Sequence, residues 1–320
     1  MHPIVIAHRG ASGYLPEHTL EGKALAFGLG ADFLEQDVVA TRDGVLVVLH
    51  DPYLDDITDV ATRFPEKRRN DGQFYVIDFD VAELKTLRVC ERRRHGTADP
   101  LFVNRFPGGV TPFRINTLDE ELDLIRGLNH STGRNVGVYP EIKNPKWHRE
   151  HGIDLSRLLL DKLAEHGYRR AEDPVFVQCF DAEELHRVRR SLGCRLRLVQ
   201  LVSTEPAYAK LLTPAGLRGV AEYANGLGPS YSQLVTVDPK GTPVPTSLAA
   251  QAHAANLAVH AYTFRRDALP PYARTLEQLV EAFLTDVGID GLFCDQPDVA
   301  VRVRDAWTER QSPLNAPEAR

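Results

Sequence analysis

The sequence has little of what marks a protein outside the ordinary globular classes. Its four cysteines, Cys90, Cys179, Cys194 and Cys294, show no Cys-x-x-Cys spacing, which argues against a zinc site and against a disulfide framework. No apolar run approaches the roughly 18 residues that a membrane-spanning helix needs. Lysine and arginine (38) are fewer than aspartate and glutamate (44), so the formal charge is −6. We therefore expect no nucleic-acid partner and no membrane span.

The N-terminus also lacks the parts of a secretion signal. Residues 1–7 contain no basic stretch and no long apolar stretch, so we expect no signal peptide in this chain. What the sequence does contain is 43% hydrophobic and 26% charged residues over 320 positions. That composition is typical of a globular protein, and the length suits one large α/β barrel or two medium domains.

Short apolar runs alternate with helical patterns such as those of residues 118–125 and 182–188 along the chain. This alternation favours a parallel α/β sheet or a closed (β/α)8 barrel. The runs cover residues 4–7, 33–40, 45–50, 136–142, 175–180, 196–202, 226–228, 257–264 and 288–294.

Two stretches depart from the alternation. Only residues 41–44 separate the second run from the third, and Asp43-Gly44 is a strong signal for a tight turn. A two-residue turn there would place His50 opposite Asp37, and a tight link of another kind would still return His50 to the same rim. Residues 51–113 lack the alternation, which predicts an insertion after the third strand. We predict one domain over 1–311, with this insertion, and a loose tail at 312–320.

The first apolar run ends in His8-Arg9-Gly10. Catalytic groups of a barrel lie where strands end, and this pair offers an imidazole that titrates near neutrality and a guanidinium that grips phosphate. Taken alone, such a dipeptide more often has a structural role, with the histidine capping a loop and the arginine in a surface ion pair.

Three acidic residues stand inside apolar strands. Glu35 and Asp37 are two residues apart, so they share one face of the second run, and Glu141 shares a face with Lys143 in a later run. Both faces of a barrel strand are covered, and buried carboxylates need a cation to hold them. Three carboxylates without His or Cys companions favour Ca²⁺ or Mg²⁺ over zinc. Arg9 and Lys143 would then hold a phosphate.

Two later strands place polar and aromatic side chains near their ends. Gln178 and Phe180 share one face, as do His260 and Tyr262. Phe180 fits a ligand pocket and the core equally well, whereas the hydroxyl of Tyr262 favours a pocket. Cys179 points to the helix side and fits inert packing. Three further histidines stand in polar segments typical of the surface, and they are His18, His148 and His151.

Seven segments combine these residues into one joint pattern over nearly the whole chain. They are His8-Arg9-Gly10-Ala11-Ser12-Gly13-Tyr14-Leu15-Pro16-Glu17-His18-Thr19-Leu20, Leu34-Glu35-Gln36-Asp37, Val48-Leu49-His50-Asp51, Tyr139-Pro140-Glu141-Ile142-Lys143, Gln178-Cys179-Phe180-Asp181-Ala182, Val259-His260-Ala261-Tyr262-Thr263 and Gly291-Leu292-Phe293-Cys294-Asp295. The pattern closely resembles the glycerophosphodiester phosphodiesterase family, and most of all its bacterial GlpQ-type members, which are often periplasmic. The broader family more often has asparagine where His18 stands, and the bacterial members share the histidine.

The resemblance implies a (β/α)8 barrel with an insertion after the third strand. It also implies Ca²⁺-assisted hydrolysis of glycerophosphodiesters, for example glycerophosphocholine and glycerophosphoethanolamine, to sn-glycerol 3-phosphate and an alcohol. Carried over residue by residue, the family's metal ligands fall on Glu35, Asp37 and Glu141, its catalytic histidines on His8 and His50, and its phosphate-binding arginine on Arg9. Glu17 falls on a motif position with a supporting role. The set of substrate-binding residues that we expect is Arg9, Lys143, Glu17, Gln178, Phe180 and Tyr262.

Several alternatives stay open at this point. Another barrel phosphodiesterase, of the lysophospholipase D or phosphoinositide type, or a non-catalytic glycerophosphodiester-binding protein would also fit the barrel; the pair of His8 and His50 argues against the latter. Either water or the substrate's own hydroxyl could attack phosphorus. The compartment would be periplasmic if a signal peptide has been removed and cytoplasmic if Met1 is the native start. The protein would be a monomer or a homodimer.

The leaving alcohol is expected to make few contacts. The polar side chains that we place at strand ends converge on the phosphate and on one glycerol-sized group. The remaining strand ends offer no anionic pair and no aromatic cage for an ammonium group. We expect the alcohol to project toward solvent beneath the insertion, and kcat/KM to vary by no more than roughly a hundredfold among headgroups.

Overall fold

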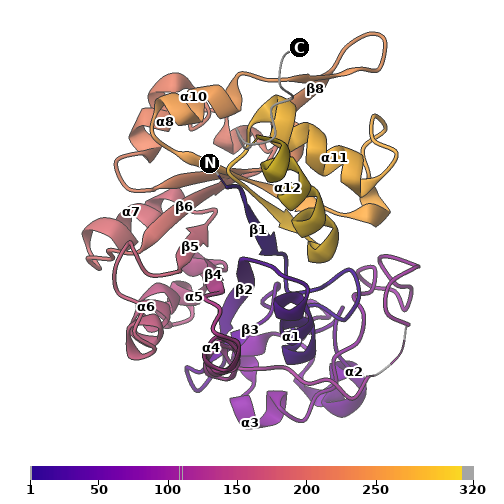
Figure 1. The fold of residues 1–320 in the computed structure, drawn as a ribbon. Helices are drawn as coiled ribbons and strands as arrows, with labels where there is room; N and C mark the ends of the chain where they lie inside the picture. The colour runs from indigo at the N-terminus through magenta and orange to yellow at the C-terminus, as the bar shows by residue number, and fades with distance from the viewer. Residues whose placement is uncertain (1, 108, 110, 312–320) are drawn as a thin grey trace, which may run out of the picture.

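Eight parallel strands close into a barrel in the computed structural model, which describes residues 2–107, 109 and 111–311 (Figure 1). The order of the sheet follows the chain, and β1 closes the ring by pairing with both β2 and β11. The predicted (β/α)8 barrel is confirmed. Its strands are β1 (Ile4–Ala7), β2 (Phe33–Ala40), β4 (Gly137–Ile142), β5 (Phe176–Cys179), β6 (Arg197–Val202), β7 (Gly226–Pro229), β10 (Ala258–Phe264) and β11 (Gly291–Cys294).

The third apolar run forms β3 (Leu46–Val48), which lies outside the ring and pairs antiparallel with the end of β2. The turn between them contains three residues, Arg42–Gly44, because the backbone N–H of Thr41 donates to Val45 O at 3.0 Å. Gly44 takes the left-handed conformation (φ +77°) that closes such a turn. A three-residue turn shifts the register by one position from that of a two-residue turn.

The register that would place His50 directly opposite Asp37 is therefore wrong, although the hairpin itself is present. Val38 pairs with Val48, so Asp37 lies beside Leu49 and its carbonyl accepts a hydrogen bond from the Leu49 N–H at 2.9 Å. His50 follows one residue later and still reaches the rim of the barrel.

Helices cover the outside of the barrel, and local sequence explains where they begin. For example, Thr117 and Glu120 form a capping box at the start of α4, where each side chain bonds the other residue's backbone N–H. The helices of the outer layer are α1 (Leu20–Gly28), α4 (Leu118–Thr132), α6 (Leu155–Glu165), α7 (Ala182–Arg190), α8 (Pro214–Val220), α10 (Leu248–Ala254), α11 (Leu276–Ala282) and α12 (Pro297–Gln311).

Shorter elements lie in the loops between strands and helices. Two short strands, β8 and β9, form a separate antiparallel hairpin. These elements are α5 (Pro145–Glu150), α9 (Tyr231–Leu234), β8 (Val235–Val237), β9 (Pro243–Pro245), and the short helices η3 (Pro206–Tyr208), η4 (Arg266–Ala268) and η5 (Phe283–Val287).

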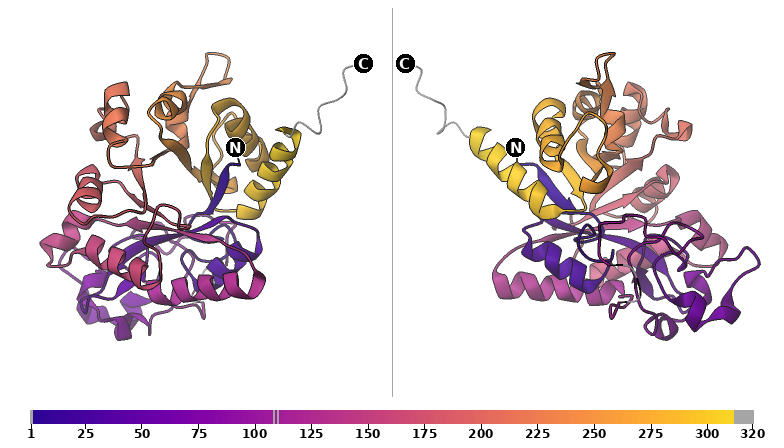
Figure 2. Two further views of the ribbon diagram at one scale, coloured as in Figure 1. Left: turned by 60° about the vertical axis from the view of Figure 1, so that its left-hand side comes forward. Right: turned by 90° about the vertical axis from the view of Figure 1, so that its right-hand side faces the viewer.

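The insertion after β3 contains the helices α2 (Val60–Arg63) and α3 (Val81–Leu84) and the single turns η1 (Pro65–Lys67) and η2 (Val76–Asp78). In both views of Figure 2 it lies on the side of the molecule away from α8 and α10. Its apolar side chains form a second core cluster on the β2–β3 hairpin. The members are Val39, Val47, Leu49, Leu54, Ile57, Val60, Phe74, Val76, Phe79, Leu84, Leu87, Val89 and Ile115.

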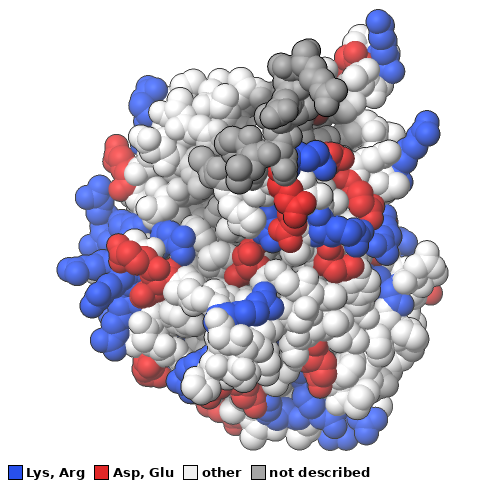
Figure 3. All heavy atoms as spheres, viewed as in Figure 1, with Lys and Arg blue, Asp and Glu red and all other residues white. Residues whose placement is uncertain are grey.

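The limits of one domain over 1–311 stay a prediction, and the tail 312–320 lies outside the described residues. Within residues 2–107, 109 and 111–311, no helix is long and apolar enough to cross a membrane. Figure 3 shows acidic and basic side chains side by side on the surface, with a group of basic ones over α7, which carries Arg187, Arg189 and Arg190.

An aromatic layer fills the barrel beneath its carboxyl end. The rings of Tyr139 and Phe176 stack at 5.0 Å, and Phe293 meets Tyr139 edge to face at 5.0 Å. His260 joins this layer, and its Nδ1 lies 2.7 Å from the hydroxyl of Tyr139. The polar side chains of the rim therefore pack against this closely packed aromatic layer.

Candidate active site

The carboxylates of Glu35, Asp37 and Glu141 meet at the carboxyl end of the barrel. The parallel pairing of β2 with β4 sets Asp37 beside Glu141, and the alternation of β2 brings Glu35 to the same interior face. One oxygen from each residue lies within 4.8 Å of the other two, and all three side chains are buried. The oxygen Oδ1 of Asp37 is buried without a hydrogen-bond partner.

The electrostatics of this cluster fit a bound cation. Burial and the neighbouring charges of Asp37 and Glu141 raise the pKa of Glu35 well above its ordinary value. Burial and Asp37 also raise the pKa of Glu141 to about 7, against the opposing effect of Lys143. Asp37 stays ionised in spite of burial, because Lys143 and His18 hold its pKa well below the ordinary value. An orphaned carboxylate oxygen among mutually repelling acids is a suitable site for Ca²⁺ or Mg²⁺.

His18 lies against this cluster, so the expectation of a surface position is wrong for it. Its Nε2 is 2.7 Å from Oδ2 of Asp37, and only 3% of the residue is exposed. The polar loop that carries it folds into the rim, where the His18 N–H donates to Arg9 O. The expectation is wrong for His148 as well, which α5 turns inward toward the N–H of Ala40, and right for His151, which is exposed.

Arg9 and Lys143 bring positive charge to the acidic cluster. The N–H of Arg9 donates to Glu35 at 2.8 Å, which its left-handed backbone (φ +56°) makes reachable. Its guanidinium contacts Glu17 at 2.9 Å and Asp37 at 3.5 Å, and its Nε has no hydrogen-bond partner. The ammonium of Lys143 lies 2.8 Å from Glu141. Both cations are therefore placed where a phosphate could displace part of their carboxylate contacts.

His8 is held by a carboxylate from the far end of the chain. Its Nδ1 lies 2.6 Å from Oδ1 of Asp295, because the pairing of β1 with β11 ends at this point. Arg105, from the insertion, bonds the second oxygen of Asp295 at 2.5 Å. With Nδ1 engaged, Nε2 of His8 faces the cluster, 3.9 Å from Glu35. Burial lowers the pKa of His8 to about 4 although Asp295 opposes the shift, so the ring is neutral at pH 7.

His50 has a similar support on the other side of the cluster. Its Nδ1 lies 2.8 Å from Oδ1 of Asp51, and Arg92 of the insertion binds the other oxygen at 2.6 Å. Burial, together with the charges of Arg9 and Lys143, lowers the pKa of His50 to about 3. Each histidine is thus hydrogen-bonded to a carboxylate, and an arginine of the insertion binds the other oxygen of that carboxylate.

The remaining predicted binding residues lie around the same centre. Gln178 is buried and its Nε2 donates to Glu35 at 2.9 Å, and Tyr262 donates its hydroxyl to Val202 O at 2.9 Å. Phe180 is half-buried and meets Tyr262 edge to face at 6.0 Å. Cys179 turns to the outer core, as predicted.

One pocket of about 210 Å³ brings most of these side chains together. Glu17 lines a neighbouring pocket of about 220 Å³ beneath the insertion, which also contains His8, Arg9 and His50. The lining of the first pocket comes from seven barrel strands and from His50 after β3. It consists of His8, Arg9, Glu35, Asp37, His50, Glu141, Lys143, Gln178, Phe180, Leu201, Tyr262, Thr263, Arg265 and Phe293.

Four supporting residues received no role from the sequence, although Asp51 and Asp295 belong to the segments that carry the resemblance. Asp295 and Asp51 each follow a histidine-bearing or terminal strand, so the rule that functional groups sit at strand ends could have found them. Arg92 and Arg105 lie in the insertion, where no periodicity or motif separates them from the many other arginines.

The fold and this site define a class of protein: a (β/α)8 barrel with buried carboxylates, imidazoles and cationic side chains gathered at its carboxyl rim. The comparisons with known proteins narrow the class. Residues 8–299 match the model of the glycerophosphoryl diester phosphodiesterase family. The chain belongs to this family.

Curated relatives match along most of the chain. A glycerophosphodiester phosphodiesterase of Haemophilus influenzae is 42% identical over 93% of this chain and 88% of its own length. One of Treponema pallidum is 36% identical over 93% of this chain and 91% of its own.

Solved structures share the fold. A putative glycerophosphoryl diester phosphodiesterase of Silicibacter pomeroyi has a TM-score of 0.72 at 24% identity, covering 96% of this chain and 94% of its own. A phosphodiesterase of Oleispira antarctica, solved with the product sn-glycerol-3-phosphate, has a TM-score of 0.65 at 23% identity, covering 95% of this chain and 97% of its own.

Proposed function

We propose that the protein hydrolyses glycerophosphodiesters, such as glycerophosphocholine and glycerophosphoethanolamine, to sn-glycerol 3-phosphate and an alcohol. One observation carries this proposal: a single pocket of about 210 Å³ gathers three carboxylates, three basic side chains and two supported histidines. Membership of the family and the printed activity of the relatives support the choice of substrate.

Glu35, Asp37 and Glu141 would hold a Ca²⁺ ion, with Mg²⁺ as the alternative. Their oxygens are close enough to share one ion, and the buried Oδ1 of Asp37 accepts no hydrogen bond, so its lone pairs are available to a cation. When bound, the ion would supply positive charge next to the phosphoryl oxygens.

Arg9 and Lys143 bind the phosphate and neutralise the charge that grows on its oxygens in the transition state. Glu17 orients the Arg9 guanidinium through the contact at 2.9 Å, and Gln178 orients Glu35. Phe180 and Tyr262 line the wall against which the glycerol moiety packs. These contacts fix the phosphorus atom between the two histidines.

His8 acts as the base and His50 as the acid, each worth ~10²–10⁴ in rate. His8 is neutral at pH 7, and Asp295 occupies its Nδ1, so Nε2 is free to accept the proton of the nucleophile. His50 must carry a proton to the leaving oxygen. Burial is the largest cause of the lowered pKa of His50, followed by the charges of Arg9 and Lys143. A phosphodiester bound to Arg9 and Lys143 places one negative charge beside them, so substrate binding raises the pKa of His50.

The test is to incubate the purified protein with glycerophosphocholine and Ca²⁺ and to measure glycerol 3-phosphate enzymatically. We expect the wild type to release glycerol 3-phosphate. We expect His8→Ala to reduce the rate of release at least a hundredfold. A cyclic phosphate as the final product would instead assign a lyase of the phosphoinositide or lysophospholipase D type. Binding of the substrate without any product would assign a binding protein.

A further inference from the structure

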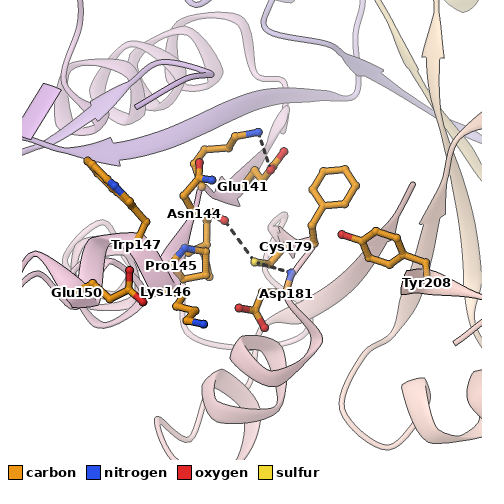
Figure 4. Close-up of a pocket in the computed structure, with 12 residues that line it drawn as sticks. Glu141, Asn144, Pro145, Lys146, Trp147, Glu150, Cys179, Asp181 and Tyr208 are labelled. Carbon is orange, nitrogen blue, oxygen red and sulfur yellow. Dashed lines mark hydrogen bonds and ion pairs between the residues drawn. The ribbon is translucent and has the colours of Figure 1, made fainter. Parts of the chain in front are cut away.

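A larger pocket of about 620 Å³ opens beside the catalytic pocket, over the loops that follow β4 and β5 (Figure 4). We define this side pocket by Trp147, Glu150, Asp181 and Tyr208. It shares Glu141, Lys143 and Phe180 with the catalytic pocket, so the two cavities meet at the acidic cluster. A substrate with its phosphate at that cluster can therefore extend one arm into the side pocket.

Aromatic rings form two walls of the side pocket. Figure 4 shows Trp147 and Tyr208 on opposite sides of the cavity. Tyr75 of the insertion stacks on Trp147 with ring centroids 5.7 Å apart, and Phe180 meets Tyr208 edge to face at 6.2 Å. Each of the two wall rings is thus held by a second ring behind or beside it.

The side pocket carries an excess of negative charge. Glu141 and Lys143 neutralise each other at 2.8 Å. The other charged side chains in the lining are Lys146, Glu150 and Asp181, and none of the ion pairs among the described residues involves them. Two unpaired carboxylates thus face one unpaired ammonium. The pKa of Tyr208 is raised by burial and by Glu205 and Asp181, which agrees with a negative field at that wall.

The pocket lined partly by the insertion has the reverse character. Beneath the insertion, Arg9, Arg92, Arg105 and Arg265 line a cavity of about 220 Å³ together with two acidic residues, Glu17 and Asp295. That cavity repels a cationic group, whereas the side pocket attracts it.

We propose that the side pocket binds the ammonium group of the leaving alcohol, so that the enzyme prefers choline and ethanolamine esters to uncharged ones. Aromatic faces combined with carboxylates are the chemistry that recognises quaternary and primary ammonium groups. The inference rests on the proposed function, because it assumes a bound glycerophosphodiester. It replaces the expectation that the alcohol projects to solvent beneath the insertion. The residues at strand ends did not predict this pocket, because its walls Trp147 and Tyr208 lie in short helices of the loops that follow the strands.

The experiment compares kcat/KM for glycerophosphocholine with kcat/KM for glycerophosphoglycerol, which has a similar size and no cation. In the doubly substituted variant Glu150→Gln, Asp181→Asn, we expect the ratio of choline to glycerol ester to fall about tenfold, mainly through KM. Asparagine can still cap α7, as Asp181 does now through the N–H of Glu184. Lys146→Gln removes the unpaired cation and should raise the ratio two- to threefold.

Glu183→Gln is the matched control, since it removes one negative charge from an exposed position of the same helix outside the pocket. It should leave the ratio as in the wild type. If the wild type releases glycerol 3-phosphate from neither ester, the proposed function fails. If the wild type hydrolyses both and the double variant keeps the wild-type ratio, only the side-pocket proposal fails.

Inhibition provides a second measurement that needs no variant. Choline should inhibit the wild type about tenfold more strongly than its uncharged isostere, in which a tert-butyl group replaces the trimethylammonium group. Equal inhibition by the two alcohols would overturn the proposal.

Discussion

Arg92 holds Glu17 through two parallel hydrogen bonds, with Nη2 2.6 Å from Oε1 and Nε 2.8 Å from Oε2. Its third nitrogen reaches Asp51 at 2.6 Å. Glu17 in turn binds Arg9, and Asp51 binds His50. A single arginine of the insertion therefore connects the proposed phosphate-binding side chain to the proposed acid, and it fixes the orientation of both.

Replacing this arginine should damage the site and the fold together. In Arg92→Gln, two largely buried carboxylates lose their partner, which costs about 3 kcal/mol of unfolding free energy. We expect kcat/KM to fall at least tenfold, because Arg9 and His50 are no longer held. Urea denaturation and steady-state kinetics measure the two effects. Arg94→Gln, at an exposed position of the same loop, should change neither.

The carboxylate behind His8 should matter more for rate than for binding. Asp295→Asn keeps the shape of the side chain, but its amide no longer stabilises the imidazolium that forms when His8 accepts a proton. We expect kcat to fall by ~10²–10⁴ with KM nearly unchanged. Asp286→Asn, exposed on η5, is the control. A change confined to KM would contradict the role of Asp295.

The two histidines should behave as a unit. His8→Ala and His50→Ala should each lower kcat by several orders of magnitude with little effect on circular dichroism. The double variant should be far less impaired than the product of the two single effects predicts. Once either histidine is lost, the other contributes little to the rate, so removing it as well costs little more. Strictly multiplicative losses would show that they act in separate steps.

Chelation should abolish turnover. The three carboxylates repel one another without a cation, so exhaustive EDTA treatment should stop release of glycerol 3-phosphate and added Ca²⁺ should restore it. Adding Mg²⁺ to the same stripped protein compares the two ions. Asp37→Asn should also lower the rate, because it removes charge from the cluster while keeping its shape. Full activity after EDTA would rule out the metal.

The contribution of His260 to stability should fall as the pH drops below 6.5. Burial lowers the pKa of His260 to about 4, so between pH 6.5 and about 4 the unfolded chain binds a proton that the folded chain does not. The unfolding free energy then decreases by up to about 1.4 kcal/mol per pH unit for this group. Other buried histidines act in the same direction, whereas Glu141, whose pKa burial raises to about 7, acts in the opposite direction. The comparison with His260→Gln therefore isolates the share of His260. Urea midpoints measured across this range should fall less steeply in the variant.

The barrel strands could be predicted because both of their faces are buried. Every residue of β2 is buried, for example, and its apolar run stands out in the sequence. The hairpin was recognisable from Asp43-Gly44, but its register depends on the hydrogen bond between Thr41 and Val45, and local composition does not distinguish two-residue from three-residue turns there.

The site was predictable to the extent that it lies on strand ends. Glu35, Asp37 and Glu141 meet as the alternation and the parallel order require. The burial of His18 could not be inferred from its polar neighbours, because the loop around it gains its hydrogen bonds from the folded rim. Arg92 and Arg105 were also out of reach, since only the folded insertion brings them to Asp51 and Asp295.

Closure of the barrel also determines when His8 acquires its carboxylate partner during synthesis of the chain. The register that pairs Ala7 with Cys294 is what brings His8 to Asp295, so the partner of the first histidine arrives with the final strand of the ring. Synthesis delivers the N-terminal residues first. A chain stalled or cleaved before Asp295 would already carry the acidic cluster and Arg9, yet its His8 would have no partner. Such a fragment would lack the carboxylate that orients His8, the proposed base.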